Sequence, residues 1–86
     1  MFILKNAGIE CAARGLQQGK IAFRSVVDFF TEDAYLYYDG EWVCRHHHEG
    51  LMEFNNKYTF TQQDVFATDW IIADKEITIH KEKFNE

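Results

Sequence analysis

The chain has no proline and only one serine among its 86 residues. Without proline, low-complexity segments or internal repeats, nothing marks a linker, so we expect a single domain over residues 1–86. The chain also lacks a glycine-rich phosphate loop, and no pair of carboxylates stands out from its acidic background. We therefore expect a protein that is not an enzyme and that needs no cofactor.

Positive charge and cysteine are also scarce. Nine basic residues against fourteen acidic ones give a formal net charge of −5, which opposes binding to polymeric nucleic acid by counterion release. Cys11 falls in a helical pattern and Cys44 in a strand pattern, which suits reduced cytosolic thiols. No apolar run approaches the roughly 20 residues of a membrane span, and residues 1–4 are too short for a secretion signal. We expect a cytoplasmic protein with neither a nucleic-acid polymer nor a membrane as partner.

Aromatic residues, by contrast, are abundant: eight Phe, four Tyr and two Trp. A chain of this length buries only roughly 60–65% of its unfolded surface, so its core is small and cannot use all of these rings. Oligomerisation often supplements a core of this size, and we expect a homo-oligomer, either a dimer or a tetramer.

The residue pattern predicts an α+β fold. Apolar residues at i, i+3, i+4 and i+7 predict a helix that Asn6 caps and Gly19 ends; they are Ile9, Ala12, Ala13 and Leu16. A strand over residues 20–25 should follow directly. Strands at 35–38 and 42–45 flank Asp39-Gly40, a dipeptide typical of hairpin turns. A second hairpin is predicted over residues 51–60, turning at Asn55-Asn56.

The last third of the chain carries the clearest local signals. Thr61 with Asp64 three residues later fits a capped helix start, and residues 65–67 would form one short apolar turn. Residues 70–73 predict a strand, residues 77–79 an edge strand, and residues 81–86 a frayed end. The sequence thus predicts one N-terminal helix packed on a small antiparallel sheet built of hairpins, with a short helical turn before a late strand.

The histidine triplet raises the question of a metal. Cys44, His46 and His48 would lie on one side of a strand, and zinc takes such ligands. Successive ligands on one strand face are roughly 6–7 Å apart, too far for all three to reach one ion. We therefore expect a solvated loop at the triplet and no metal site.

Both ends of the chain resemble a known family. The run Ile9-x-x-Ala12-Ala13-x-x-Leu16-Gln17-x-Gly19-Lys20, followed by Ala22 and Arg24, resembles the opening of the second Thoeris anti-defence family of small phage domains. Phe60-Thr61, Asp64, Ala67, Asp69-Trp70 and Ile72 are similar to its closing signature. The resemblance covers roughly residues 9–73 of the chain. It implies a small α+β protein that forms symmetric oligomers and sequesters nucleotide-derived immune messengers, such as a cyclic ADP-ribose isomer or a cyclic oligonucleotide (the messengers of Thoeris and CBASS defence), without degrading them.

One position departs from that family. Where the family usually has a tryptophan that helps to hold the ligand's base, this chain has Val27, followed by Asp28-Phe29-Phe30. Either Phe29 or Phe30 stacks on the base instead, or the pocket takes a different ligand, or the pocket is lost. Two adjacent residues of an extended chain face opposite ways, so at most one of these rings should be core.

A nucleotide sponge needs a stacking surface, a cation and polar groups. Six residues are candidates for these roles: Arg24, Ser25, Phe29, Phe30, Asp69 and Trp70. Arg24 could grip a phosphate in a bidentate fashion, with Ser25 also reaching it, while Asp69 could accept from a base edge or a ribose hydroxyl. Trp70 could stack on a base, or it could be a core residue at the start of an apolar strand.

A different function remains open on the same frame. The protein could inhibit or adapt a host protein through an aromatic interface that includes Tyr35, Tyr37 and Trp42, residue types that interface hot spots favour. The resemblance favours messenger capture, and protein docking is the alternative.

Overall fold

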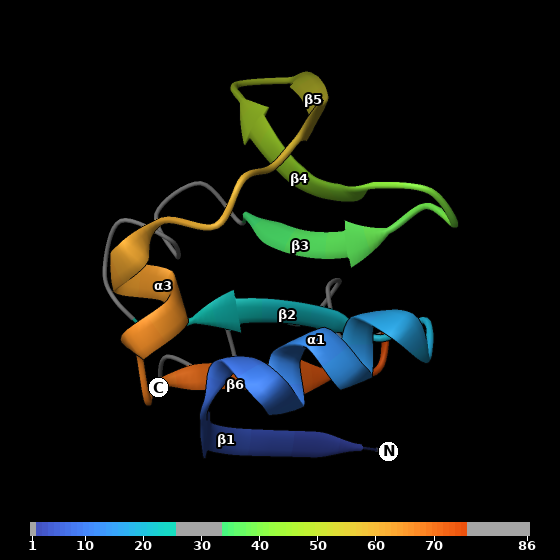
Figure 1. Cartoon of the computed structure of the whole chain (residues 1–86). Helices are drawn as coiled ribbons and strands as arrows, with labels where there is room; N and C mark the ends of the chain where they lie inside the picture. Colours follow the sequence, from blue (N-terminus) through green and yellow to red (C-terminus); the bar gives the residue numbers. More distant parts are fainter. Residues whose placement is uncertain (1, 26–33, 76–86) are drawn as a thin grey trace.

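The computed structural model describes residues 2–25 and 34–75. Its elements, in chain order, are β1 (Ile3–Ala7), α1 (Ile9–Gln17), β2 (Ile21–Arg24), β3 (Tyr35–Tyr38), β4 (Val43–Glu49), β5 (Met52–Lys57), α3 (Gln62–Phe66) and β6 (Trp70–Ala73). The six strands form one antiparallel sheet in the order β1-β6-β2-β3-β4-β5, with α1 lying across the β6 and β2 region (Figure 1). The predicted α+β fold, with its N-terminal helix and its short helical turn before a late strand, is confirmed.

The N-terminal helix ends as predicted but begins elsewhere. Gly19 takes a φ of 83° and donates to the carbonyl of Leu16, while the amide of Lys20 donates to Gly15, which together form a Schellman end. The cap at the other end is Gly8, not Asn6, so the predicted capping residue was wrong. Asn6 instead has a φ of 56° within β1, at an irregularity in the pairing of that strand with β6.

The strand β1 was not predicted. Four of its five residues are exposed, and Lys5 and Asn6 interrupt any alternation of apolar and polar positions. Its position depends on pairing with β6, which lies about 70 residues away along the chain at register pairs such as Ile3 with Ala73. The local pattern of the first seven residues therefore could not predict this strand.

Only the first of the two predicted hairpins is correct. β3 and β4 pair around Gly40, whose φ is 100°, and Asp39 accepts hydrogen bonds from the amides of Glu41 and Trp42. The hairpin predicted for residues 51–60 is wrong. The turn falls at Gly50, with a φ of 63°, and Asn55 lies in the middle of β5.

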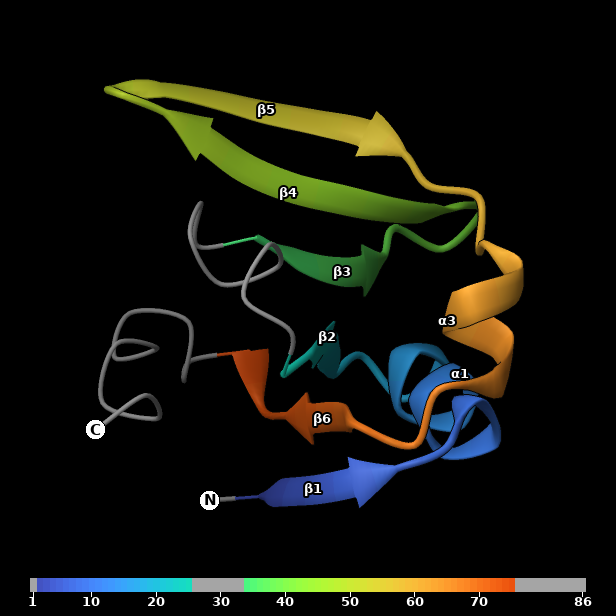
Figure 2. The ribbon, with the colours of Figure 1, turned by 90° about the vertical axis from the view of Figure 1, so that its left-hand side faces the viewer.

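The histidine triplet lies on a strand and not on a loop. His46, His47 and His48 belong to β4, where they pair with Asn55, Phe54 and Glu53 of β5. β4 is therefore longer than the four residues predicted for it, and the β4–β5 hairpin projects away from both helices (Figure 2).

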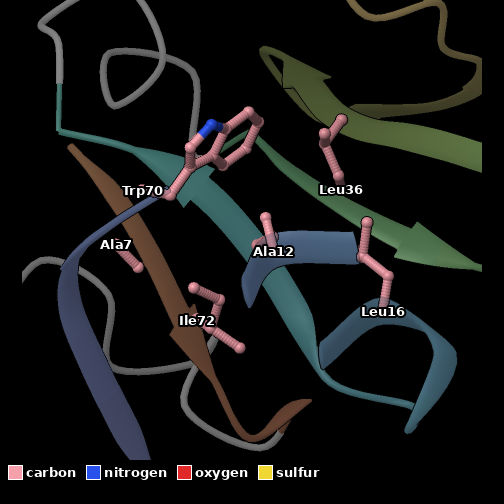
Figure 3. Packing of buried hydrophobic residues seen from close by; sticks show 7 residues of the cluster. Ala7, Ala12, Leu16, Leu36, Trp70 and Ile72 are labelled. Carbon is pink, nitrogen blue, oxygen red and sulfur yellow. The ribbon is translucent and has the colours of Figure 1, made fainter. Parts of the chain in front are cut away.

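The sheet buries apolar side chains on both faces. On the helix side, the buried cluster comprises Ala7, Ala12, Leu16, Ala22, Leu36, Trp70 and Ile72, most of which Figure 3 shows. On the opposite side, a smaller cluster comprises Ile21, Phe23, Ile71 and Ala73. Gly15 lets α1 approach the sheet closely, because a Cβ at that position would lie 2.5 Å from Cγ2 of Ile72.

Some sequence predictions concern parts of the chain outside the described residues. They are the edge strand at residues 77–79, the frayed end at residues 81–86, and the loop that carries Val27, Phe29 and Phe30.

Candidate functional site

Asp64 is the centre of a polar cluster next to α3. Its backbone amide donates to the hydroxyl of Thr61, while its own carboxylate accepts from the amide of Thr61, so the predicted capping box is present. The same carboxylate accepts a hydrogen bond from the Tyr58 hydroxyl at 2.5 Å and one from Arg24 Nη1 at 3.3 Å. Asp64 is only 2% exposed, so the three hydrogen bonds that its carboxylate accepts, from Thr61, Tyr58 and Arg24, replace the water that the charge has lost.

Arg24 lies between two carboxylates. Its Nε donates to Oδ1 of Asp69 at 2.9 Å and its Nη1 to Asp64, and its side chain is only 16% exposed. The hydroxyl of Ser25 donates to the second oxygen of Asp69 at 3.2 Å. The arginine charge is thus matched by protein carboxylates, and a phosphate that bound here would have to replace at least one of them.

The structure brings four of the six predicted site residues together, but with unequal access. Arg24, Ser25 and Asp69 form one cluster where β2 ends and β6 begins. Trp70 lies in the core with 0% exposure and donates from Nε1 to the carbonyl of Asp64, so its ring faces protein on all sides. Of the two alternatives for Trp70, stacking on a base or packing in the core, the structure shows packing in the core. Phe29 and Phe30 lie outside the described residues.

The cluster shifts the pKa values of its members. Burial alone would raise the pKa of Asp64, but the hydrogen bonds from Tyr58, Thr61 and Arg24 outweigh it and hold the pKa below its usual range. Burial, and then donation to Asp64, raises the pKa of Tyr58 far above that of a free tyrosine. Burial would lower the pKa of Arg24, yet Asp69 and Asp64 raise it. These shifts keep Asp64 charged and Tyr58 protonated.

An aromatic pocket lies beside this cluster. It has a volume of about 420 Å³ and is lined by Tyr38, Glu41, Trp42, Val43, Lys57, Tyr58, Thr59 and Phe60. The ammonium of Lys57 lies 3.9 Å from the centre of the Trp42 ring, and that tryptophan is 48% exposed. A second hollow of about 180 Å³ adjoins it along α1 and shares Tyr38, Val43 and Phe60 with it. Ring faces and a cation thus meet at one open surface.

Tyr58 connects the pocket to the polar cluster. Its ring forms part of the pocket wall and meets Phe60 edge to face, while its hydroxyl is held by Asp64. Phe60 in turn meets the buried Trp70 edge to face at 5.9 Å. Arg24, Asp64 and Trp70 therefore act as supports behind the pocket, because they fix the rings that line it.

Sequence reasoning did not place this pocket. The sequence suggests only a docking role for Trp42, and the hairpin that it predicts over residues 51–60, which includes Lys57, is wrong. The lysine reaches the tryptophan because β5 pairs with β4 so that Lys57 lies opposite Cys44. Only the register of β5 brings them together, and a sequence pattern that misplaces the turn misplaces the lysine.

No family model matches the chain, and no curated protein or solved structure shows significant similarity to it. Neither helix in the described part of the chain is long and apolar enough to span a bilayer.

Proposed function

We propose that the protein binds and sequesters a nucleotide-derived immune messenger, a cyclic ADP-ribose isomer or a cyclic oligonucleotide, without degrading it. In this proposal it is a phage anti-defence protein that acts in the cytoplasm of the infected host. The resemblance of both chain ends to messenger sponges suggests the ligand class. The observation that carries the proposal is the aromatic pocket with Lys57 over Trp42.

The pocket suits the ligand's two chemical parts. Stacking of a base on an aromatic ring contributes about 1–3 kcal/mol, and Trp42 and Tyr38 are 48% and 40% exposed, so both rings are within reach of a ligand. The Lys57 ammonium lies over one face of the Trp42 ring, so a base stacks on the other face or displaces the lysine, which then pairs with a phosphate. The volume of about 420 Å³ lies within the range of small-molecule sites, about 300–1,000 Å³.

Charge near the pocket is mixed. Arg45 is close enough to act on the Tyr58 hydroxyl electrostatically, and Lys57 adds a second positive charge. Glu41 also lines the pocket and opposes an anionic ligand. Asp64 also acts on the Tyr58 hydroxyl, so the cations near the pocket are offset by carboxylates, and Lys57 is the lining group that would pair with a phosphate.

The residues that the sequence suggests as ligand contacts mark a second possible binding location, separate from the aromatic pocket. The Arg24–Asp69–Ser25 cluster ends β2, immediately before the segment that contains Phe29 and Phe30. Cyclic oligonucleotides carry more than one phosphate and base, cyclic ADP-ribose isomers carry two phosphates and one base, and a homo-oligomer would place further surfaces beside each pocket. The pocket and the cluster are therefore two locations that an experiment can separate.

The test is thermal unfolding against cyclic dinucleotides, cyclic trinucleotides and cyclic ADP-ribose isomers. A ligand at 100 times its dissociation constant adds about 2.7 kcal/mol of stability, which gives a clear shift in Tm. The compound should be recovered intact after the protein is heated, as mass spectrometry would check. The panel is then repeated with Trp42→Ala, Lys57→Met and Arg24→Lys, which keeps the charge but loses the bidentate fork.

The outcomes separate the two locations. Loss of the shift in Trp42→Ala and Lys57→Met, with retention in Arg24→Lys, supports the aromatic pocket. The reverse pattern moves the ligand to the Arg24 cluster. A conversion product in place of the intact compound, or a flat response of the unaltered protein to the whole panel, overturns messenger capture.

A second candidate function is inhibition or adaptation of a host protein. The exposure of Trp42 favours it, because large exposed aromatic side chains are typical anchors of protein interfaces. A flat nucleotide panel combined with a host protein captured by the unaltered chain, but not by Trp42→Ala, supports this candidate.

A further inference from the structure

Three potential metal ligands converge on the β4–β5 hairpin, away from the aromatic pocket. Within the described residues, the ligating atoms of His46, His48 and Glu53 all lie within 4.8 Å of one another. His46 and His48 are alternate residues of β4 and share one face, and Glu53 is paired with His48 across the strands. The proposed function uses none of these three residues.

The spacing of the two imidazoles fits a shared ion. Nε2 of His46 lies 3.3 Å from Nε2 of His48. Two nitrogens bound to one tetrahedral zinc at about 2.0–2.1 Å lie about 3.3–3.4 Å from each other. The two rings meet edge to face, with their centres 4.9 Å apart. Their ligating atoms are thus already at the separation that one ion requires.

A second layer of contacts fixes the tautomer of His46. Its Nδ1 lies 2.8 Å from Oδ1 of Asn55, which also accepts from the Tyr37 hydroxyl at 3.2 Å. A carbonyl oxygen can only accept, so Nδ1 carries the proton and Nε2 presents its lone pair toward His48. Metal-bound histidines are commonly oriented in this way by an oxygen at their other nitrogen. The ring of Tyr35, 4.8 Å from that of His46, holds it further in place.

Glu53 completes the set from the neighbouring strand. Its Oε1 lies 3.9 Å from Nε2 of His48, somewhat longer than the ligand spacing in a zinc site. Its side chain is 64% exposed, so it can rotate inward without displacing packed atoms. Two imidazoles and one carboxylate are a ligand set that binds Zn²⁺ and leaves a fourth position for water.

We propose that His46, His48 and Glu53 bind one divalent transition-metal ion, with Zn²⁺ the best fit to this ligand set. The expectation of no metal rested on three ligands from a single strand. The structure replaces one of them: Sγ of Cys44 is directed to Asp39 at 3.7 Å, and Glu53 of β5 takes its place. The two histidine side chains also point toward each other, so their Nε2 atoms are 3.3 Å apart, although alternate residues of a strand are roughly 6–7 Å apart along the backbone.

The test is calorimetric titration of chelator-treated protein with Zn²⁺, together with the visible absorption of Co²⁺ at the same site. We expect one ion per chain and a tetrahedral Co²⁺ spectrum. Loss of an outer-shell partner typically costs about 10–100-fold in metal affinity, so the His46→Gln/His48→Gln double variant, which removes two direct ligands, should lose at least about 100-fold, and Glu53→Gln at least about 10-fold. The matched control is His47→Gln, because His47 stacks on Phe54 with ring centres 5.1 Å apart and is not among the three ligands.

Circular dichroism establishes that each variant is folded. The double variant could fail to fold because Tyr35 loses its contact with the His46 ring. In that case His48→Gln/Glu53→Gln is used instead, since it keeps His46 and changes the two more exposed ligands. Equal affinity in the unaltered protein and in a folded ligand variant overturns the proposal. So does a loss in His47→Gln as large as that in the ligand variants, or a titration of the unaltered protein that shows no binding.

Discussion

The strands β6 and β5 belong to one sheet but differ in their position in the sheet and in how far their side chains are buried. β6 lies between β1 and β2 beneath α1, and all four of its residues are buried. β5 forms the opposite edge of the sheet, and five of its six residues are exposed. Figure 2 shows the same contrast in space, since the β4–β5 hairpin extends away from both helices, whereas α1 covers β6.

This contrast assigns different tasks to the two halves of the sheet. In the inner half, formed by β1, β6 and β2, burial of the apolar side chains of β6 and β2 supplies most of the stability. In the outer half, formed by β3, β4 and β5, Leu36 of β3 also belongs to the core, and β4 and β5 are held mainly by their backbone ladder. The side chains there, including Trp42, Lys57 and the histidines, are therefore available for binding.

The sharpest test compares the chain's two tryptophans. Trp70→Ala removes a fully buried indole in contact with Phe60 and should cost about 3–5 kcal/mol. An 86-residue domain is stable by only about 4–13 kcal/mol, so this loss is a large fraction of the total stability. Trp42→Ala, at a side chain 48% exposed, should cost less than about 1 kcal/mol.

Urea unfolding followed by circular dichroism measures both variants. The unequal losses should persist when the protein concentration is varied, because the comparison concerns contacts within one chain. Equal losses in the free energy of unfolding at the two positions would show that the outer half contributes as much to stability as the inner half, and would contradict the proposed contrast.

A second comparison uses two aspartates whose carboxylates accept hydrogen bonds from backbone amides. They are Asp64, in the polar cluster at α3, and Asp39, in the β3–β4 hairpin. Asp64→Asn weakens hydrogen bonds to Tyr58 and Arg24 inside a buried site and should cost about 2–3 kcal/mol. Asp39 is exposed, so Asp39→Asn should cost clearly less.

The pH dependence of Asp64 has a defined sign. Its pKa is lowered in the folded protein, so the charged form stabilises the fold. That stability is present above the pKa of an unfolded aspartate, about 3.9, and is lost as the pH falls through the folded pKa. The gap in urea midpoint between the unaltered protein and Asp64→Asn should therefore shrink in acid. A gap that stays constant across that range would assign the loss to packing and not to charge.

Local signals in the sequence gave the elements that depend on neighbouring residues. The Thr61–Asp64 capping box and the Asp39-Gly40 hairpin rest on contacts within a few positions, the late strand at Trp70 shows as a local apolar run, and the structure has all three. β1 depends on its distant partner β6, and the turn at Gly50 is local but was missed because Asn55-Asn56 favours a turn more strongly. Asn55-Asn56 favours a turn locally, but cross-strand contacts to His46 and Tyr37 hold Asn55 in β5.

The candidate sites were harder to predict for the same reason. The sequence pointed to Arg24 and Asp69 separately, but their ion pair, and the further bond from Arg24 to Asp64, join β2 to the far end of the chain. Lys57 reaches Trp42, and Glu53 reaches His48, only through the register of β5 against β4. Sites assembled across strands need the pairing to be known first.

The smallest expected effect tests how tightly the inner half is packed. Gly15→Ala adds a methyl group 2.5 Å from Cγ2 of Ile72, and such overpacking costs about 1–3 kcal/mol. Alanine returns up to about 1 kcal/mol through its higher helix propensity, so a net loss of about 1 kcal/mol is expected. Gly8→Ala is the steric control, because no atom lies within 4 Å of the added methyl group; at the N-cap its only expected effect is the small loss from replacing a favoured capping residue.

The double variant Gly15→Ala/Ile72→Leu identifies the cause, since leucine lacks the Cγ2 methyl group that alanine would meet. If that contact is responsible, the two substitutions together should cost less in urea unfolding than the sum of the single losses. Additive losses would trace the effect of Gly15→Ala to another source. A stabilised Gly15→Ala variant would mean that α1 moves away from β6 at little cost, and the inner half would then be less rigid than its complete burial of Ile72 indicates.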